Sequence, residues 1–220
     1  MIKELYTRAI TILMKKPVRL WGISLLGGVL GIVAAILFSV PLGLSIAINM
    51  LLETGLVMVF LHGIRGEEVK AVQLFDCFKD WNTIKRVLAG MGWRALWIFL
   101  WFLIPVVGWV IACVKYYSWY LVPYILVQEP DIAPTEALAV SAQRTEGKKW
   151  QLFFAELLPS LAIGVVGIVI SRFAMIPYIG VLFAIVYFVF NIVTTLLLPL
   201  FMGLVGAGIY ENLKNGASAE

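Results

Sequence analysis

The chain has 220 residues, of which 62% are hydrophobic and 14% charged, and its formal net charge is +4. Soluble domains carry about a quarter charged residues, so this composition excludes an ordinary soluble domain. The cations flank apolar runs instead of forming a basic patch, so we expect no nucleic-acid partner. Cys77 and Cys113 fall in a polar and an apolar segment respectively, and their spacing predicts neither a disulfide nor a metal site. We also expect no cofactor.

Six long apolar runs follow one another along the chain. Each is close to the roughly twenty residues that a helix needs to cross a bilayer, and a backbone without water must satisfy its hydrogen bonds internally. The sequence therefore predicts an all-α, polytopic membrane bundle of six transmembrane helices, forming one domain over residues 1–220. Pro199 in the last run is expected to kink the helix or to end its membrane part early. The predicted spans are about 20–40, 42–63, 87–105, 106–127, 151–171 and 178–208.

The cations predict the topology, because cytoplasmic loops carry an excess of Lys and Arg. With six spans and a cytoplasmic N-terminus, only Arg172 lies outside, and Arg94 and Lys115 fall within spans. One long span over 87–127 would move the last cationic cluster outside, so the pattern favours a hairpin at Pro105–Gly108. We expect a multi-pass protein of the bacterial cytoplasmic membrane with both termini in the cytoplasm. The cytoplasmic cations are then Lys3, Arg8, Lys15, Lys16, Arg19, Arg65, Lys70, Lys79, Lys85, Arg86, Arg144, Lys148, Lys149 and Lys214.

Two cytoplasmic connections, Glu67–Arg86 and Pro130–Trp150, are each predicted to form a short amphipathic helix at the membrane interface. One interpretation is that these helices only anchor the protein and cover the bundle. The other is that they form a docking surface for anionic lipid headgroups or for a membrane protein partner. The cations of that surface would be Lys79, Lys85, Arg86, Lys148 and Lys149.

A set of short motifs between residues 104 and 153, with two more near the C-terminus, resembles a known family. The motifs are Ile104-Pro105, Tyr116-Tyr117-Ser118, Pro123-Tyr124-Ile125-Leu126, Glu129-Pro130-Asp131, Glu136-Ala137, Ser141, Gly147-Lys148-Lys149-Trp150, Phe153, Ile176-Pro177-Tyr178 and Ile209-Tyr210-Glu211. Together they resemble a family of uncharacterised bacterial integral membrane proteins, related to the membrane domain attached to some glycerophosphoryl diester phosphodiesterases. The resemblance covers about residues 75–213 and implies six membrane helices and no catalytic residues. One departure is Pro105-Val106-Val107-Gly108, where the family tends to place Gly directly after Pro, so we expect a longer turn here.

Four ionisable residues fall inside the apolar spans: Glu53, Arg94, Lys115 and Glu156. A lone charge at the bilayer centre costs at least about 2.5–3.5 kcal/mol, and these two anions and two cations occupy overlapping depths. We therefore expect pairing, with Glu53 next to Arg94 or Lys115, while Glu156 and Arg94 have the alternative of reaching towards the cytoplasmic surface. Three roles remain open for this cluster, namely structural ion pairs, a solute or proton path, and contact with lipid or a partner.

The function predicted from the sequence is not enzymatic. The chain has no His-Glu-x-x-His, Gly-x-Ser-x-Gly or P-loop motif, and its three aspartates lie in cytoplasmic segments, which excludes a paired-aspartate intramembrane protease. We expect a membrane protein that binds lipid or assists a partner complex in export or envelope stress. The alternative is a small-solute or proton transporter or channel that uses the intramembrane charges.

Overall fold

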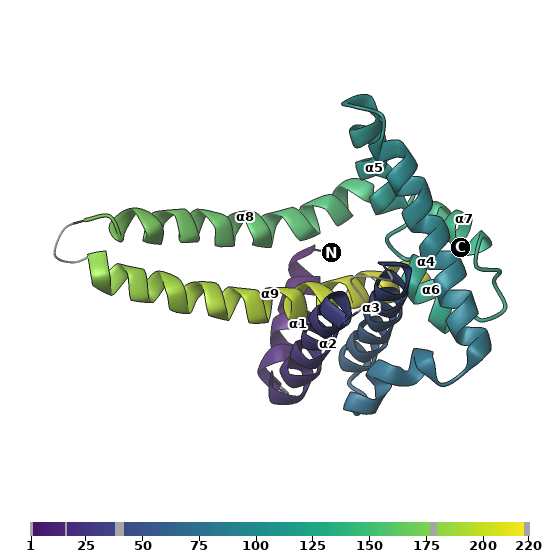
Figure 1. Ribbon diagram of the computed structural model, residues 1–220, viewed down its shortest axis with the longest axis horizontal. Helices are drawn as coiled ribbons and strands as arrows, with labels where there is room; N and C mark the ends of the chain where they lie inside the picture. Colours follow the sequence, from purple (N-terminus) through teal and green to yellow (C-terminus); the bar gives the residue numbers. More distant parts are fainter. Residues whose placement is uncertain (1, 16, 38–41, 177–179, 218–220) are drawn as a thin grey trace.

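The computed structural model describes residues 2–15, 17–37, 42–176 and 180–217; most of these are helical, and there is no strand among them (Figure 1). This confirms the predicted all-α class. The junction between the first two predicted spans, at residues 38–41, and the start of the last predicted span lie outside the described residues. The helices are α1 (Ile2–Lys15), α2 (Pro17–Leu37), α3 (Leu42–Arg65), the short 3₁₀ helix η1 (Ala71–Phe78), α4 (Trp81–Phe102), α5 (Val107–Ser118), α6 (Val122–Gln128), α7 (Glu136–Arg144), α8 (Lys149–Phe173) and α9 (Gly180–Ala217).

Five segments of the described chain are long and apolar enough to cross a membrane: Arg19–Ile36, Gly43–Arg65, Val107–Gln128, Lys149–Phe173 and Gly180–Gly216. The predicted third span corresponds to α4, which has 22 residues but carries Lys85, Arg86 and Arg94. These three cations make α4 less suited than the other long helices to span the hydrocarbon layer. The described residues thus contain several long apolar helices, and the count of six spans stays a prediction.

The molecule consists of a helical bundle and a long two-helix arm (Figure 1). In the arm, α8 and the first half of α9 lie side by side and extend away from the other helices. The last part of α9 returns into the bundle, where it packs against α1, α2, α3 and α7. At 38 residues, α9 is about 57 Å long, well beyond the hydrocarbon thickness of a bilayer. Pro199 lies inside this helix, which continues to Ala217, so the helix does not end at the proline.

The core of the bundle forms around the last part of α9. Leu200, Leu204 and Tyr210 are fully buried there. A side chain at Gly203 would overlap the ring of Phe60 on α3, so the absence of a Cβ lets these two helices approach closely. The buried end of α9 therefore holds the helices of the bundle together.

The predicted fourth span is two helices, because the chain breaks between α5 and α6. The hydroxyl of Ser141 on α7 donates to the carbonyl of Ser118 (2.8 Å) and accepts from the backbone N–H of Leu121 (3.2 Å). The hydroxyl of Thr145 also donates to Ser118 (3.1 Å). These bonds satisfy backbone groups that the break leaves free. The segment predicted as an interfacial helix, 130–150, thus places α7 against the bundle with buried Ser141 and Thr145.

The other predicted interfacial segment, 67–86, is divided between η1 and the first turn of α4. Leu74 and Cys77 of η1 are buried, whereas Val72 and Phe75 are exposed. A side chain at Gly55 on α3 would overlap the backbone carbonyl of Leu74, so η1 lies directly on the α3 backbone. One face of the predicted amphipathic segment therefore packs on the bundle and its other apolar residues face outward.

The predicted turn between the third and fourth spans is present and extends over Leu103–Val106. Val106 has a positive φ of 62°, and the N–H of Val107 donates to the carbonyl of Pro105 (2.8 Å). Such a tight turn is strained for a β-branched residue. After it, α5 packs against α4, and a side chain at Gly108 would overlap the carbonyl of Trp101.

Candidate functional site

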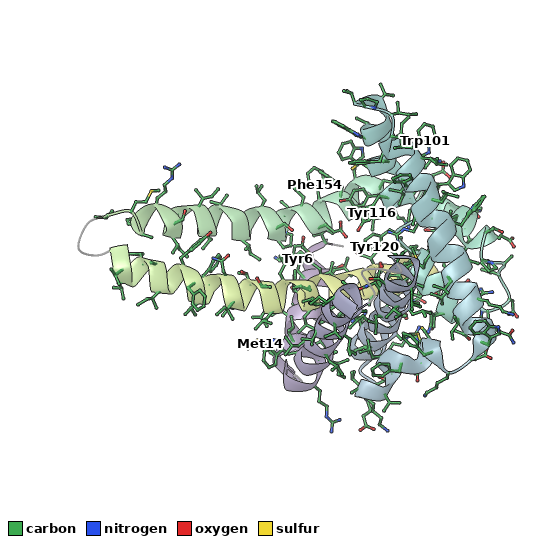
Figure 2. The ribbon with its side chains drawn as sticks, viewed as in Figure 1. Tyr6, Met14, Trp101, Tyr116, Tyr120 and Phe154 are labelled. Carbon is green, nitrogen blue, oxygen red and sulfur yellow. The ribbon has the colours of Figure 1, made fainter. Side chains whose placement is uncertain are left out.

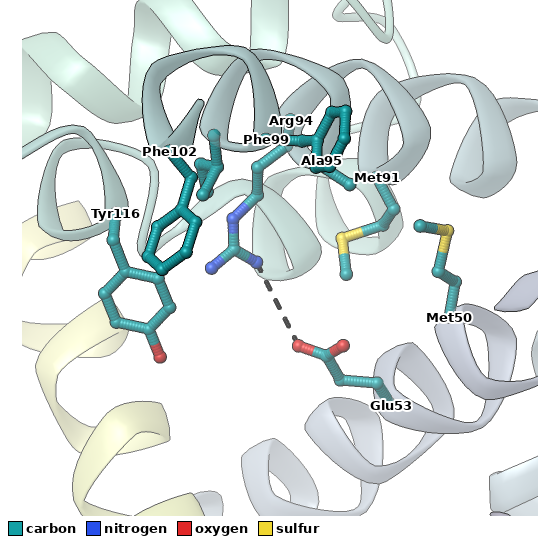
Figure 3. Close-up of a pocket in the computed structure, with 9 residues that line it drawn as sticks. Met50, Glu53, Met91, Arg94, Ala95, Phe99, Phe102 and Tyr116 are labelled. Carbon is teal, nitrogen blue, oxygen red and sulfur yellow. Dashed lines mark ion pairs between the residues drawn. The ribbon is translucent and has the colours of Figure 1, made fainter. Parts of the chain in front are cut away.

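A cavity of about 500 Å³ lies between α3, α4 and α5 (Figure 3). Three of its lining side chains are polar: Glu53 from α3, Arg94 from α4 and Tyr116 from α5. The other lining residues are apolar: Met50, Met91, Ala95, Ile98, Phe99 and Phe102. Apolar walls around a few convergent polar groups are typical of a ligand site.

Arg94 is the buried charge of this cavity, since only 9% of its side chain is exposed. Its Nη1 lies 4.0 Å from Glu53 Oε1, which is longer than a hydrogen bond. Its Nε is buried and has no hydrogen-bond partner among the described residues, and its Cζ lies 5.3 Å from the ring centroid of Tyr116. The guanidinium is thus held by charge and by an aromatic face, and part of its hydrogen-bonding capacity is unused.

Glu53 faces open space although it lies in the middle of a long apolar helix. Its side chain is 57% exposed, while Leu52 and Thr54 beside it are buried. It also lines a second cavity of about 450 Å³, next to Gly31 of α2 and Asn49 of α3. The carboxylate therefore borders two cavities, one on each side of α3.

The four charges predicted to cluster do not form a single group. Glu53 and Arg94 pair, as in one of the two expected pairings. Lys115 instead lies over the ring of Trp119, with Nζ 5.4 Å from the centroid. Glu156 accepts a hydrogen bond from the hydroxyl of Tyr117 (3.1 Å). The structure therefore pairs Glu53 with Arg94, places Glu156 within electrostatic range of Arg94, and leaves Lys115 over an aromatic ring away from them.

A stripe of four tyrosines lies near these charges, on α5, on α6 and at the break between them, and it was not predicted as a site from the sequence. It consists of Tyr116, Tyr117, Tyr120 and Tyr124, of which Figure 2 labels Tyr116 and Tyr120. A Cβ at Gly206 of α9 would lie 2.7 Å from the hydroxyls of both Tyr120 and Tyr124, so these two hydroxyls converge on α9. In an unbroken helix the spacing of 117, 120 and 124 would place these rings on one face, but the break after Ser118 separates Tyr117 on α5 from Tyr124 on α6.

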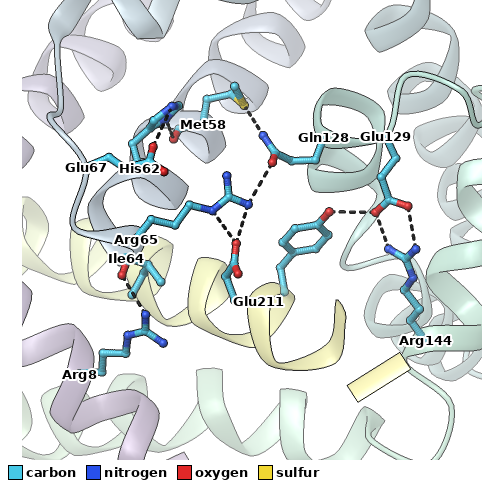
Figure 4. Close-up of polar contacts among 11 residues, drawn as sticks. Arg8, Met58, His62, Ile64, Arg65, Glu67, Gln128, Glu129, Arg144 and Glu211 are labelled. Atoms are coloured by element: carbon cyan, nitrogen blue, oxygen red, sulfur yellow. Dashed lines mark hydrogen bonds and ion pairs between the residues drawn. The ribbon is translucent and has the colours of Figure 1, made fainter. Parts of the chain in front are cut away.

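A polar network joins α6, α7 and α9 at one end of the bundle (Figure 4). Arg144 donates to both carboxylate oxygens of Glu129, at 2.6 and 2.7 Å. The hydroxyl of Tyr210 donates to the same carboxylate (2.9 Å), and its ring stacks on Tyr124, with centroids 5.1 Å apart. The Arg144 guanidinium holds the pKa of Glu129 below its usual value.

A second set of polar contacts lies beside this one. Arg65, at the end of α3, pairs with Glu211 of α9 (2.6 Å) and donates to the side-chain carbonyl of Gln128 (3.0 Å). Neither network was predicted from the sequence. Some of the residues involved belong to two motifs of the family resemblance, Glu129-Pro130-Asp131 and Ile209-Tyr210-Glu211, which the fold brings into contact.

The five cations of the predicted lipid or partner surface have different surroundings. Lys79 pairs with Asp76 (2.6 Å), and Lys85 lies over the ring of Trp81. Lys148 and Lys149 are half-buried at the start of α8.

Arg86 differs from the other four cations, because its guanidinium donates to three backbone carbonyls. These belong to Leu126 (2.9 Å), Glu129 (2.6 Å) and Pro130 (2.7 Å). Arg86 therefore holds the end of α6 in place, and its donors are directed into the protein.

The described residues contain no group of three or more His, Cys, Asp or Glu side chains suited to hold a metal ion. Comparisons of the chain with protein-family models, with curated proteins and with solved structures found no match. The family resemblance of the sequence motifs thus stays a prediction. The site is defined by its own geometry, an apolar cavity with an ion pair at its wall.

Proposed function

We propose that this chain is a non-enzymatic, six-span protein of the bacterial cytoplasmic membrane that binds anionic lipid at its cytoplasmic face. In this proposal both termini are cytoplasmic, and the lipid-bound protein assists a membrane partner complex in export or envelope stress. Support comes from the long apolar helices and from the distribution of cations along the chain.

The observation that carries the proposal is a pair of exposed tryptophans next to lysines, each at the start of a long helix. Trp81 is the first residue of α4 and lies under Lys85. Trp150 is the second residue of α8 and follows Lys149. Both indole rings are largely exposed. Tryptophan favours the headgroup region of a bilayer, and each nearby lysine contributes about 1 kcal/mol of attraction to an anionic leaflet.

The test replaces Lys79, Lys85, Lys148 and Lys149 with Gln and measures retained lipid by native mass spectrometry. The variant should retain less phosphatidylglycerol and cardiolipin than the wild type, and added salt should lower retention by the wild type. Arg86 stays unchanged, because its replacement would free three carbonyls. Lys115→Gln is the control, since this cation lies over Trp119 within a predicted span. Equal retention by the fourfold variant and the control would contradict the proposal.

A second candidate function, proton or small-solute transport, is favoured by the tyrosine stripe. Tyr117 bonds to Glu156, Tyr116 lines the cavity of Glu53 and Arg94, and the hydroxyls of Tyr120 and Tyr124 converge on Gly206. Flux into liposomes that depends on Glu53 and Glu156, with lipid retention unaffected by the four lysine replacements, would reverse the order of the two candidates.

A further inference from the structure

We propose that the cavity between α3, α4 and α5 binds one phospholipid whose headgroup carries both a phosphate and a primary ammonium, as in phosphatidylethanolamine. This rests on the proposed function in one respect, namely that the chain lies in a lipid bilayer. It concerns a different lipid and different residues from the lysine surface, so each proposal can fail while the other stands.

Arg94 supplies the group for the phosphate. Its side chain is nine-tenths buried at the cavity wall, its Nε has no hydrogen-bond partner in the described part of the chain, and its Nη1 lies 4.0 Å from Glu53 Oε1. A buried guanidinium with unused donors is costly unless an acceptor completes it. Phosphate oxygens suit a guanidinium because they accept several of its N–H groups at once.

Glu53 supplies the group for the ammonium. The Glu53 side chain is more than half exposed, although it lies near the middle of α3 between buried Leu52 and Thr54. Acyl chains cannot solvate a carboxylate, so whatever covers Glu53 in the membrane must offer donors. A primary ammonium offers three N–H donors and a positive charge.

The short distance between the two charges selects a zwitterionic headgroup. A headgroup with only a phosphate would neutralise Arg94 and be repelled by Glu53, which lines the same cavity (Figure 3). A headgroup with only a positive charge would pair with Glu53 and be repelled by Arg94. A headgroup that carries both charges leaves the whole site neutral and pairs each protein group with its opposite.

The remaining walls select a lipid over a soluble zwitterion. Ile98, Phe99 and Phe102 extend the cavity along α4 away from the ion pair, and α4 bears exposed apolar side chains at its end, including Leu103 beyond the helix. In the bilayer these walls face hydrocarbon, and the acyl chain of a bound phospholipid packs against them, which a small soluble headgroup analogue does not.

The test measures lipid retention by native mass spectrometry of the whole chain after exposure to phosphatidylethanolamine and phosphatidylglycerol at equal concentration. In the background of the four lysine replacements, which removes the proposed phosphatidylglycerol surface, the protein should retain phosphatidylethanolamine preferentially. Glu53→Gln should lower that retention by about tenfold or more and abolish the preference. Arg94→Gln should lower retention of phosphatidylethanolamine by a similar factor. Phosphatidylcholine, whose ammonium has no N–H donor, should bind less well than phosphatidylethanolamine.

A pair of alanine replacements separates loss of the site from loss of folding. Ala95→Phe fills the cavity and leaves both charges intact, whereas Ala89→Phe adds the same ring at an exposed position of α4 that does not line the cavity. Only Ala95→Phe should lower retention of phosphatidylethanolamine, and both variants should unfold at temperatures close to that of the wild type.

Three outcomes would overturn the inference. The first is equal retention of phosphatidylethanolamine and phosphatidylglycerol by the protein with the four lysine replacements. The second is phosphatidylethanolamine retention that is unchanged in both Glu53→Gln and Ala95→Phe. The third is displacement of the lipid by soluble phosphoethanolamine at comparable concentration, which would show that the headgroup alone fills the site. The four lysine replacements should leave phosphatidylethanolamine retention unchanged, so their effect on phosphatidylglycerol reports on the proposed function separately.

Discussion

Arg94 lies near the middle of α4, and its only ion-pair partner among the described residues is Glu53. Replacing Glu53 with Gln removes the counter-charge of a buried cation, so we expect Glu53→Gln to lower the unfolding temperature in detergent. In a double-mutant cycle, Glu53→Gln and Arg94→Gln should be coupled by about 0.5–2 kcal/mol.

The cycle with Lys115→Gln is the control, because Lys115 lies over Trp119 rather than next to Glu53. Glu53→Gln and Lys115→Gln should therefore have additive effects. Additive effects in the Arg94 cycle as well would mean that the 4.0 Å contact contributes nothing to the free energy of unfolding.

Glu129 predicts a pH dependence at the other end of the bundle. Its pKa is lower in the folded protein than in the unfolded chain because Arg144 binds the carboxylate through two hydrogen bonds. A carboxyl with a depressed folded-state pKa contributes stability above its unfolded pKa, and this contribution disappears as the pH falls through the folded pKa. Glu129→Gln should therefore lower the unfolding temperature at pH 7, and its difference from the wild type should shrink below about pH 4.

Glu68→Gln is a suitable comparison, because the carboxylate of Glu68 also pairs with cations, Arg19 and Lys70, but is exposed. It should change the unfolding temperature little at pH 7, since exposed ion pairs contribute little. A difference between Glu129→Gln and the wild type that stayed constant from pH 7 to pH 3 would contradict the ionic contribution of Glu129.

At the scale of the elements, the break between α5 and α6 depends on α7. Ser141 is fully buried and bonds to both sides of the break. Ser141→Ala should lower the free energy of unfolding by about 1–3 kcal/mol, because it leaves the buried N–H of Leu121 without an acceptor. Ser160→Ala is the control, since that exposed hydroxyl bonds only within its own helix. Equal effects of the two replacements, measured by thermal unfolding in detergent, would show that the bonds of Ser141 are dispensable.

The elements also show what the sequence was able to predict. Apolar length identified the long helices, because a membrane-spanning run of about twenty residues is a strong local signal. The turn after Leu103 was predictable from Pro105 and Gly108. The break after Ser118 had a local signal in Pro123, which lies in the first turn of α6 and cannot continue a preceding helix. Its geometry was not predictable, because the groups that stabilise it, Ser141 and Thr145, lie more than twenty residues further along the chain.

The charged residues of the candidate site were predictable from the sequence, but their arrangement was not. Intramembrane charge marked Glu53 and Arg94, and electrostatics predicted that Glu53 would have a cationic partner. The choice of Arg94 over Lys115 depends on how the side chains of α3, α4 and α5 face one another, which local patterns do not determine. The cavity walls and the contact between Glu129 and Tyr210, 81 residues apart, likewise depend on tertiary packing.

For the whole molecule, the proposed topology places residue 143 in the cytoplasm and residue 175 on the outside. In a Cys113→Ser background, a cysteine at Met175 should react with an impermeant maleimide in intact cells. A cysteine at Gln143 should react only after permeabilisation. Both native positions are exposed, and Cys77 is buried, so it should contribute little background. Labelling of Gln143→Cys in intact cells would refute the six-span arrangement.

The buried end of α9 has a consequence for biosynthesis. Leu204, Val205 and Tyr210 fill the centre of the bundle, yet they leave the ribosome well after α1 and α3, against which α9 packs. At roughly 5–20 residues per second, the stretch from the end of α3 to Leu204 takes about seven to thirty seconds to synthesise, and during that time α1 and α3 lack the helix that covers them. The earlier helices must therefore persist in the membrane as an incomplete assembly. A premature stop codon after the arm would remove the buried end of α9. The remaining helices would then stay incompletely packed and accessible to membrane proteases.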